Sequence, residues 1–307
     1  MLKQGYNREQ IATAINKCPS VLSREIKRNK DIRSGEYRSK LAQRKAEDRL
    51  MTKNKCIKFT PKVQKYVDQK LELQWSPEQI SNRHCDNEIQ MVSHERIYQY
   101  IIQDKKQGGE LYKNLRRKKK YRKRIGSQDN RGKIKNATSI KERPKEVDQR
   151  ARVGDFEVDL VIGANHKSAL VTINDLKTGF SKVRKVKSKN AKEVAKKIVE
   201  ILTPYKAICK TITSDNGKEF ADHRYVSKQL GIDFFFADPY SSWQRGANEN
   251  YNGLLRQYFP KKTNFNNISW QEIRRVERLL NNRPRKRLKY KTPIEVINSL
   301  TKVAFAA

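Results

Sequence analysis

Three acidic residues in the second half of the chain, Asp159, Asp215 and Glu249, have types and positions that suit a site for divalent metal ions. Asp159 lies on the polar face of a predicted strand, Asp215 follows another predicted strand, and Glu249 lies on a predicted helix after Trp243. Taken singly, each is an ordinary surface acid. Three carboxylates gathered in one domain would repel one another unless cations neutralised them.

The chemistry that such a cluster supports is phosphodiester cleavage and joining. Carboxylate oxygens favour Mg²⁺ or Mn²⁺, and two such ions can activate the attacking oxygen and stabilise the leaving oxygen of a phosphodiester. We therefore expect two Mg²⁺ or Mn²⁺ ions per active site. Glu157 shares the strand face of Asp159 and is the rival first ligand, whereas Asp175 is expected to be a turn residue.

Other chemistries have weaker support in the sequence. The chain contains neither a GxxxxGK phosphate loop nor an HExxH zinc motif, and Tyr98 and Tyr240 lack the Arg and His residues that accompany a recombinase nucleophile. The four cysteines form no CxxC pair and are expected to be free thiols. A zinc site has irregular ligand spacing; its candidate ligands are Cys56, His84, Cys85 and His94.

The net charge indicates a polyanionic partner. Of 307 residues, 69 are Lys or Arg and 33 are Asp or Glu, which gives a formal charge of +36. Nucleic acid, here double-stranded DNA, is the expected partner. No apolar run approaches the roughly 20 residues of a membrane-spanning helix, and no signal-peptide pattern is present. We expect a soluble, cytoplasmic, nucleoid-associated protein that does not bind membranes.

The elements that must position the three acids follow the order βββαβαβα. Alternating apolar residues from Phe156 to Ile162 predict the first strand, and the next two flank a turn at Thr178-Gly179. A helix capped by Asn190, a strand ending at Asp215, a helix, a strand and a helix after Gln244 complete the series. Helical crossovers beside a mixed sheet predict an α/β fold of the ribonuclease-H-like kind.

A first helix-turn-helix is predicted for residues 1–50. Asn7 and Gln10 form a cap signal for one helix, and Pro19 opens a second helix after a short turn. The second helix would contact the DNA major groove. The residues that it would present there are Ser20, Val21, Arg24, Lys27 and Arg28.

A second helix-turn-helix is predicted for residues 51–104. Ser76-Pro77 and Ser93 mark helix starts, and Val63, Val67 and Leu71 form an apolar stripe before them. The last helix would present His94, Arg96 and Gln99 to DNA. A structural three-helix bundle with a solvated basic face explains the same pattern.

Residues 105–150 are predicted to be a basic linker. Eight of the nine residues from 116 to 124 are basic, and the periodicity of apolar residues lapses there. We expect this run to bind phosphates without sequence preference; its first residues are Arg116, Arg117, Lys118, Lys119 and Lys120.

Residues 151–307 are predicted to be the catalytic domain with a basic C-terminal helix and tail. Ser269 and Glu272 indicate a capping box for a final helix that runs through Leu280. The segment NNRPRKRLKYKTPIEV that follows is expected to grip DNA phosphates.

The residues around the three acids resemble the IS-thirty family of bacterial insertion-sequence transposases. The similar motifs are GDFEVDLVIG (154–163), TSDNGKEF (213–220) and YSSWQRGANENYNGLLRQYFPK (240–261), and 33 residues separate Asp215 from Glu249. The segments REIKRN, WSPEQI, VSHERIYQYI and GGELYKNLRRK resemble the family's amino-terminal pattern. The resemblance covers almost the whole chain.

The resemblance implies a DDE transposase that binds the terminal inverted repeats of its element and uses divalent metal to cleave and join DNA. Asp159, Asp215 and Glu249 match the family's triad, which favours Asp159 over Glu157. Synapsis of two DNA ends implies a homodimer or a higher oligomer. Two other functions stay open: an inactive DNA-binding regulator derived from such a transposase, and a metal-dependent nuclease without joining activity.

The helix around Glu249 places further polar residues beside the acid. Arg245, Asn252 and Arg256 lie at i−4, i+3 and i+7 and would meet the DNA backbone, or the two arginines would pair with Glu249 along the helix. Trp243 would stack on a base or pack beside the helix start. Family members usually carry a longer segment before the first helix-turn-helix, which leaves open whether this copy recognises its repeats fully.

Overall fold

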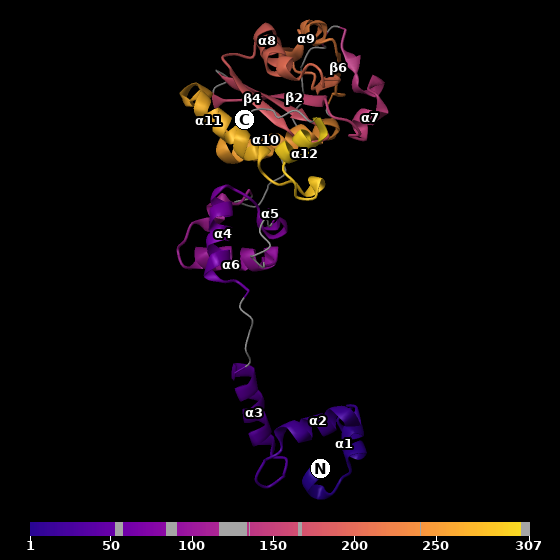
Figure 1. Cartoon of the computed structure of the whole chain (residues 1–307), viewed down its shortest axis with the longest axis vertical. Helices are drawn as coiled ribbons and strands as arrows, with labels where there is room; N and C mark the ends of the chain where they lie inside the picture. Colours follow the sequence, from indigo (N-terminus) through magenta and orange to yellow (C-terminus); the bar gives the residue numbers. More distant parts are fainter. Residues whose placement is uncertain are drawn as a thin grey trace. The chain divides into compact units, whose positions relative to one another are not determined.

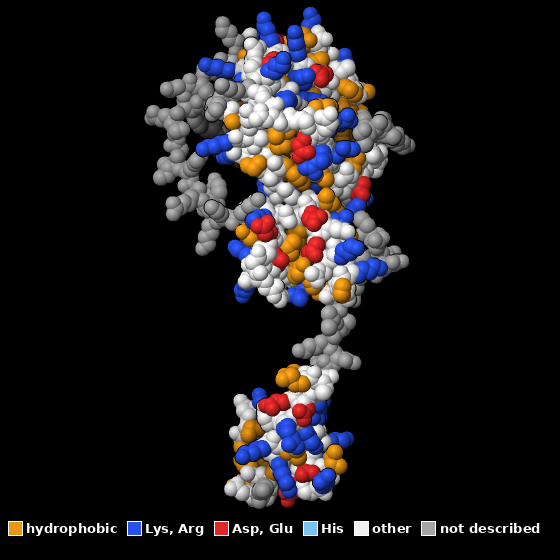
Figure 2. All heavy atoms as spheres, turned by 90° about the vertical axis from the view of Figure 1, so that its left-hand side faces the viewer, with side chains coloured by type: hydrophobic (Ala, Val, Ile, Leu, Met, Phe, Trp, Pro, Cys, Tyr) orange, Lys and Arg blue, Asp and Glu red, His pale blue; other side chains and the backbone are white. Residues whose placement is uncertain are grey.

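The computed structural model describes residues 1–52, 58–83, 91–116, 134, 136–164, 168–239 and 241–301. The chain divides into two compact units, Met1–Ile57 and Lys58–Ala307. Lys and Arg side chains are spread over the visible surface of both units (Figure 2). Within the described ranges, no helix is long and apolar enough to cross a membrane.

The first unit is a small helical module. Its helices are α1 (Arg8–Ala14), α2 (Pro19–Asn29) and α3 (Ser39–Thr52). The predicted cap of α1 is present: the Asn7 side chain accepts a hydrogen bond from Gln10 N at 2.8 Å, and Gln10 Oε1 accepts one from Asn7 N at 3.0 Å. Pro19 occupies the start of α2, where its missing N–H costs nothing. The apolar core consists of Ile11, Ala12 and Leu22, with Ile26 packed against it.

The second unit begins with another helical module. It contains α4 (Pro61–Glu72), α5 (Pro77–Asn82) and α6 (His94–Lys106). The Ser76 and Ser93 side chains cap α5 and α6 as the sequence predicts. Val63, Val67 and Leu71 of α4 are buried against Ile80, Ile97 and Ile101 of the other two helices.

α5 is attached to the C-terminal segment of the same unit. The contacts are Lys286 Nζ to Glu78 Oε1 at 2.6 Å, Gln79 Nε2 to Pro284 O at 2.7 Å, and an ion pair between Arg83 and Glu295. We refer to these three contacts as the α5–C-terminal contact. The helical module is thereby joined to residues about 200 positions later in the chain.

A six-stranded sheet forms the centre of the second unit. Its strands are β1 (Thr138–Ser139), β2 (Asp155–Ile162), β3 (Ala169–Asp175), β4 (Ser181–Val186), β5 (Thr211–Ser214) and β6 (Asp233–Phe236). Their order is β1-β6-β5-β2-β3-β4. β2, β3 and β4 are antiparallel neighbours, whereas β2, β5, β6 and β1 run parallel. The predicted ribonuclease-H-like fold is confirmed.

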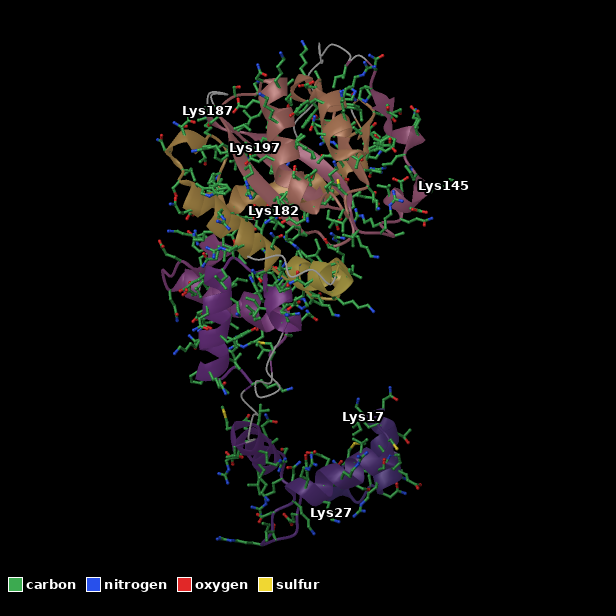
Figure 3. All side chains as sticks on the ribbon, turned by 45° about the horizontal axis from the view of Figure 1, so that its top comes forward. Lys17, Lys27, Lys145, Lys182, Lys187 and Lys197 are labelled. Atoms are coloured by element: carbon green, nitrogen blue, oxygen red, sulfur yellow. The ribbon has the colours of Figure 1, made fainter. Side chains whose placement is uncertain are left out.

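Helices cover both faces of this sheet (Figure 1). α8 (Ala191–Leu202) and α9 (His223–Leu230) pack on the face that carries Phe156, Val158 and Leu160. α10 (Gly246–Tyr258) and α11 (Trp270–Asn281) pack on the opposite face. Lys182 of β4, labelled in Figure 3, binds Glu277 of α11 at 3.1 Å. The face under α10 is the one from which Asp159 projects, because side chains alternate along β2.

Residues 138–148, placed in the basic linker by the sequence, belong to the sheet domain. β1 pairs in parallel with β6 at the sheet edge, and α7 (Lys145–Asp148) follows it. Ile140 and Val147 are buried there. A strand of two residues is too short to show alternation, which explains why the sequence did not reveal it.

The C-terminal part differs from the sequence prediction in two respects. The Ser269 side chain accepts from Glu272 N at 3.1 Å, but the Glu272 carboxylate binds Arg275, so only half of the predicted capping box forms. α12 (Pro293–Thr301), which the sequence did not single out, closes the described chain. Short 3-10 helices connect the larger elements: Leu2–Gln4, Leu111–Asn114, Ile140–Glu142, Thr203–Tyr205, Lys218–Phe220, Ser242–Arg245, Phe265–Asn267 and Lys286–Leu288.

Candidate active site

Asp159 and Asp215 lie at the same level of two neighbouring parallel strands. In the register of β2 and β5, Glu157 pairs with Thr213. Asp159 and Asp215 each come two residues after that pair, so both carboxylates reach the same end of the sheet. This juxtaposition is what the sequence predicted from strand positions.

The guanidinium of Arg245 bridges the two carboxylates. Its Nη1 lies 3.5 Å from Asp159 Oδ1, and its Nη2 lies 3.3 Å from Asp215 Oδ2. Arg245 is mostly buried, and its Nη1 makes no hydrogen bond of good geometry within the described structure. Burial raises the pKa of Asp159, and the neighbouring Asp215 adds to this rise, while Arg245 opposes it. The two acids are therefore close enough to share one cation.

Asn252 of α10 holds the Asp159 carboxylate in place. Its Nδ2 donates to Asp159 Oδ2, and its Oδ1 accepts from Thr172 Oγ1 of β3 at 3.4 Å. The sequence had assigned Asn252 to the DNA backbone. In the structure the Asn252 amide connects α10, β2 and β3. The sequence placed Asn252 near the site only through its position three residues after Glu249 on the same helix.

The rival acid Glu157 has a different environment. It is 2% exposed, and its Oε2 accepts a hydrogen bond from Asn248 N at 3.0 Å in the first turn of α10. A carboxylate at this position satisfies a free helix N–H and interacts favourably with the helix dipole. Burial nevertheless raises the pKa of Glu157. This contact positions the helix that carries Glu249.

Glu249 is exposed on α10, and the ion pairs that join Asp159, Asp215 and Arg245 do not include it. It lines a cavity of about 460 Å³ with Arg116, Gly246 and Asn250. Arg116 Nη1 donates to Asn250 Oδ1 at 2.8 Å, so the first residue of the basic run lies on α10. Among the described residues, no three His, Cys, Asp or Glu side chains are arranged to hold one ion.

The donor set nevertheless fits a hard divalent cation. Two carboxylates already share the guanidinium of Arg245, which directly precedes α10, and α10 supplies both Asn252 and the third acid. Oxygen donors of this kind are the ligands that Mg²⁺ and Mn²⁺ prefer.

The two arginines that flank Glu249 make contacts elsewhere. Arg245 binds the aspartates, while Arg256 donates to Ile162 O at 2.7 Å and to Pro260 O at 3.3 Å. Burial lowers the pKa of Arg256. The alternative of helical ion pairs with Glu249 is thus not what the described structure contains.

The arginines of the C-terminal segment make contacts within the protein, and contact of this segment with DNA phosphates remains a prediction. Arg283 is 2% exposed and donates to Gln79 and Gln257. Arg285 and Arg287 donate to backbone carbonyls of Leu280 and Leu176. Burial lowers the pKa of Arg285 to about 9. These arginines hold the chain end against the sheet domain.

The residues predicted to contact DNA in the two helical modules are exposed. On α2 these are Ser20, Arg24, Lys27 and Arg28, and Lys27 extends from the helix in Figure 3. On α6, His94 is exposed, and the Arg96 guanidinium lies 5.0 Å from the Phe59 ring centroid. Their contact with DNA remains a prediction.

Several further predictions concern other residues. Asp175 was expected to be a turn residue but is the last residue of β3; its carboxylate accepts from Thr178 N of the following turn at 2.7 Å and from Gly154 N at 2.8 Å. Cys18 and Cys209 are free thiols. Arg117 to Lys120, the zinc candidates Cys56, His84 and Cys85, and Tyr240 lie outside the described residues.

Comparison with known proteins identifies the family. The chain is 47% identical over its whole length to the transposase for insertion sequence element IS4351 from Bacteroides fragilis, of which it covers 95%. It is 36% identical over 94% of its length to transposase InsI for element IS30A of Escherichia coli, covering 77% of that protein. The chain belongs to the IS30 (IS-thirty) family of insertion-sequence transposases. No family model matches the sequence.

Two further similarities accompany these. The transposase is 34% identical to the transposase for insertion sequence element IS1086 of Cupriavidus metallidurans over 94% of its length, covering 87% of that protein. Among solved structures, the catalytic core domain of BIV integrase aligns with a TM-score of 0.38 and 20% identity, covering 48% of this chain and 97% of that chain.

Proposed function

We propose that this transposase cuts and joins DNA at Asp159, Asp215 and Glu249 with divalent metal. The observation that carries the proposal is the pair of carboxylates that already share the Arg245 guanidinium, side by side at the same level of adjacent parallel strands. Mg²⁺ or Mn²⁺, two ions per site, would supply activation of the attacking oxygen and stabilisation of the leaving oxygen. Asp159, Asp215 and Glu249 would hold these ions.

The protein's own residues prepare this chemistry. Asn252 orients the Asp159 carboxylate, and Glu157 fixes the start of α10, which carries Glu249. Positioning of this kind lowers the cost of reaching the reactive geometry. When Arg245 leaves the two aspartates, its charge becomes available to a DNA phosphate beside them.

The proposed reaction has two steps on DNA. In the first, water attacks the phosphorus at an end of the element, which breaks one P–O bond and leaves a 3′-hydroxyl and a 5′-phosphate. In the second, that hydroxyl attacks a target phosphodiester, forms a new P–O bond and displaces a 3′-oxygen, which takes up a proton. The helical modules would bring the terminal inverted repeats to the site, and a homodimer or higher oligomer would hold two ends together.

Single substitutions test the triad. Asp159→Asn, Asp215→Asn and Glu249→Gln should each reduce strand transfer at least 100-fold on DNA from the element's ends in Mg²⁺, and EDTA should abolish it without preventing DNA binding. Asp233→Asn, at an exposed acid that begins β6, is the control and should retain activity.

The outcomes distinguish the three functions. Activity that survives both Asp215→Asn and Glu249→Gln contradicts the proposed site. Cleavage without joined products indicates a nuclease. A wild-type protein that binds the ends but never cuts them indicates a regulator, which no observation on the described residues favours.

A further inference from the structure

A second cavity adjoins the carboxylate pair. It measures about 440 Å³, within the range of roughly 300–1,000 Å³ typical of small-ligand sites. Its walls come from the segment 140–150, from β2 at Glu157 and from residues 243–246 at the start of α10. Glu157 lies two residues before Asp159 on the same strand face, and Arg245 separates two lining residues, Gln244 and Gly246. A DNA strand whose phosphate reaches the aspartates would pass this cavity.

A fixed arginine lines the cavity. The Arg143 side chain is 6% exposed; its Nη1 donates to Thr213 Oγ1 at 3.0 Å, and its Nη2 binds Asp148. Its Nε is buried without a hydrogen-bond partner in the described structure. A buried polar group without a partner is costly, and a ligand in the cavity is one source of the missing acceptor.

Positive charge predominates around the opening. Arg150 is exposed and forms no ion pair within the described ranges, whereas the Lys141 side chain is 77% exposed and its Nζ lies 3.8 Å from Asp238 Oδ2. The two acids of the cavity wall are already engaged, Asp148 by Arg143 and Glu157 by the Asn248 N–H. The charge of Arg150, together with the exposed Lys141 ammonium, therefore suits an anionic ligand.

An exposed indole completes the cavity. Trp243 is 74% exposed and has no ring or cation partner within the described structure. Trp270, the other exposed tryptophan of this unit, lies beneath the Arg184 guanidinium at 4.5 Å. An aromatic ring left open beside basic groups is the arrangement that binds an unstacked base together with its phosphate.

We infer that this cavity takes one unstacked nucleotide of the DNA strand held at the active site. Trp243 stacks on its base, and Arg143, Arg150 and Lys141 face its polar groups and phosphate. The inference rests on the proposed function, because that function brings the strand past the cavity. Withdrawing one nucleotide from the duplex would also fix the position of the strand relative to Asp159 and Asp215.

The test uses the full chain and duplexes of the element's ends that carry 2-aminopurine at successive positions around the cut, in Ca²⁺ to prevent reaction. Binding of wild-type protein should raise the fluorescence at one position, because a 2-aminopurine in the cavity has lost both of its duplex neighbours and stacks on Trp243 with one face only. Trp243→Ala should remove that rise and weaken binding by about 5- to 150-fold, the equivalent of ~1–3 kcal/mol of base stacking. Trp270→Ala is the matched control and should retain both.

A rescue experiment separates this role from a structural one. An abasic site at the position where the fluorescence rises removes most of the free-energy cost of unstacking a base. It should therefore restore strand transfer by Trp243→Ala towards the wild-type rate. Arg150→Ala, at an exposed side chain that leaves the core intact, should weaken end binding and lower the fluorescence rise.

Unchanged fluorescence and binding in Trp243→Ala, or a rise at no position with wild-type protein, overturns the inference and leaves the metal-dependent function standing. Full activity of Asp215→Asn overturns the proposed function instead, and the fluorescence signal is independent of that result.

Discussion

Arg245 occupies the position between Asp159 and Asp215 that a divalent cation would need. Its guanidinium neutralises part of the repulsion between two carboxylates that burial and proximity would otherwise destabilise. A metal ion entering this position has to displace the guanidinium. The resting protein is thus stabilised at the expense of metal affinity.

Arg245→Gln should therefore increase the response to metal. Without the guanidinium the two acids repel each other, so the variant should melt at a lower temperature in EDTA and gain more from Mg²⁺ or Mn²⁺ than the wild type does. Each kcal/mol of extra stabilisation corresponds to about 2–4 °C in a domain of this size. Arg275→Gln, which removes an exposed helical ion pair with Glu272, is the control. Equal metal-induced shifts in the wild type and Arg245→Gln would contradict the prediction.

The two acids of β2 should respond differently to isosteric substitution. Glu157→Gln keeps an oxygen that can accept from Asn248 N, so strand transfer should stay within about tenfold of wild type, with a stability loss of ~0.5–2 kcal/mol. Asp159→Asn removes a charge next to Asp215 and should abolish strand transfer without unfolding the protein. Urea unfolding and strand-transfer assays on both variants check this, and an inactive Glu157→Gln beside an active Asp159→Asn would reverse the assignment.

The sequence placed Asp159 and Asp215 together because each belongs to, or directly follows, a strand of one sheet, and β2 and β5 are neighbours in it. It could not separate Glu157 from Asp159, because both lie on the same strand face and only the approach of α10 gives Glu157 a helix N–H to accept from. The sequence did not predict that Arg245 bridges Asp159 and Asp215 either. Helical spacing places Arg245 four residues before Glu249 and so suggests an ion pair with that residue instead.

At the scale of elements, the α5–C-terminal contact joins the second helical module to the sheet domain. A hydrogen bond from Lys286 lowers the pKa of Glu78, and Tyr290 adds a second donor at 3.1 Å. A carboxyl whose pKa is depressed on folding stabilises the contact at pH values above its ordinary 4.5, and that stabilisation is lost as the pH falls through the lower, folded-state pKa.

The α5–C-terminal contact should accordingly loosen in acid. Hydrogen exchange of the α5 amides should accelerate more between pH 6 and pH 3.5 than intrinsic exchange explains, and Glu78→Gln should show faster exchange at pH 6 and a smaller further acceleration, which leaves only Glu295 of this contact to titrate. The comparison with Glu78→Gln removes the contribution of other carboxylates. Identical pH dependence in both proteins would exclude Glu78 as the responsive group.

Elements with a strong local signal were predictable, and those defined by distant contacts were not. Asn7, Ser76 and Ser93 marked helix starts because a cap acts within one turn. β1 is defined only by its pairing with β6, almost a hundred residues later. The arginines of the C-terminal segment resembled a DNA-binding tail, because composition does not show that neighbouring backbone carbonyls accept their hydrogen bonds.

At the scale of the whole molecule, the basic side chains behind the charge of +36 fall into two groups: some bind other groups of the protein, and others are exposed with few such contacts. Arg245, Arg283 and Arg285 bind carboxylates, amides or carbonyls within the second unit. The exposed basic side chains of α2 make few such contacts, and residues 117–124 contribute seven Lys or Arg. The basic residues of 117–124 should therefore be one main source of the affinity for DNA phosphates.

Replacing the seven basic residues of 117–124 with Gln should weaken binding equally on element ends and on unrelated DNA. Each phosphate contact contributes about −0.9 to the slope of log affinity against log salt, so the slope should become shallower by up to roughly 6. Arg24→Ala on α2 should instead reduce the preference for element ends and change the slope by less than about 1, because base contacts carry sequence information and phosphate contacts do not. Fluorescence anisotropy at 50 to 300 mM salt measures both. If the Gln replacement lowered the preference for element ends while the slope stayed constant, residues 117–124 would be reading sequence rather than charge.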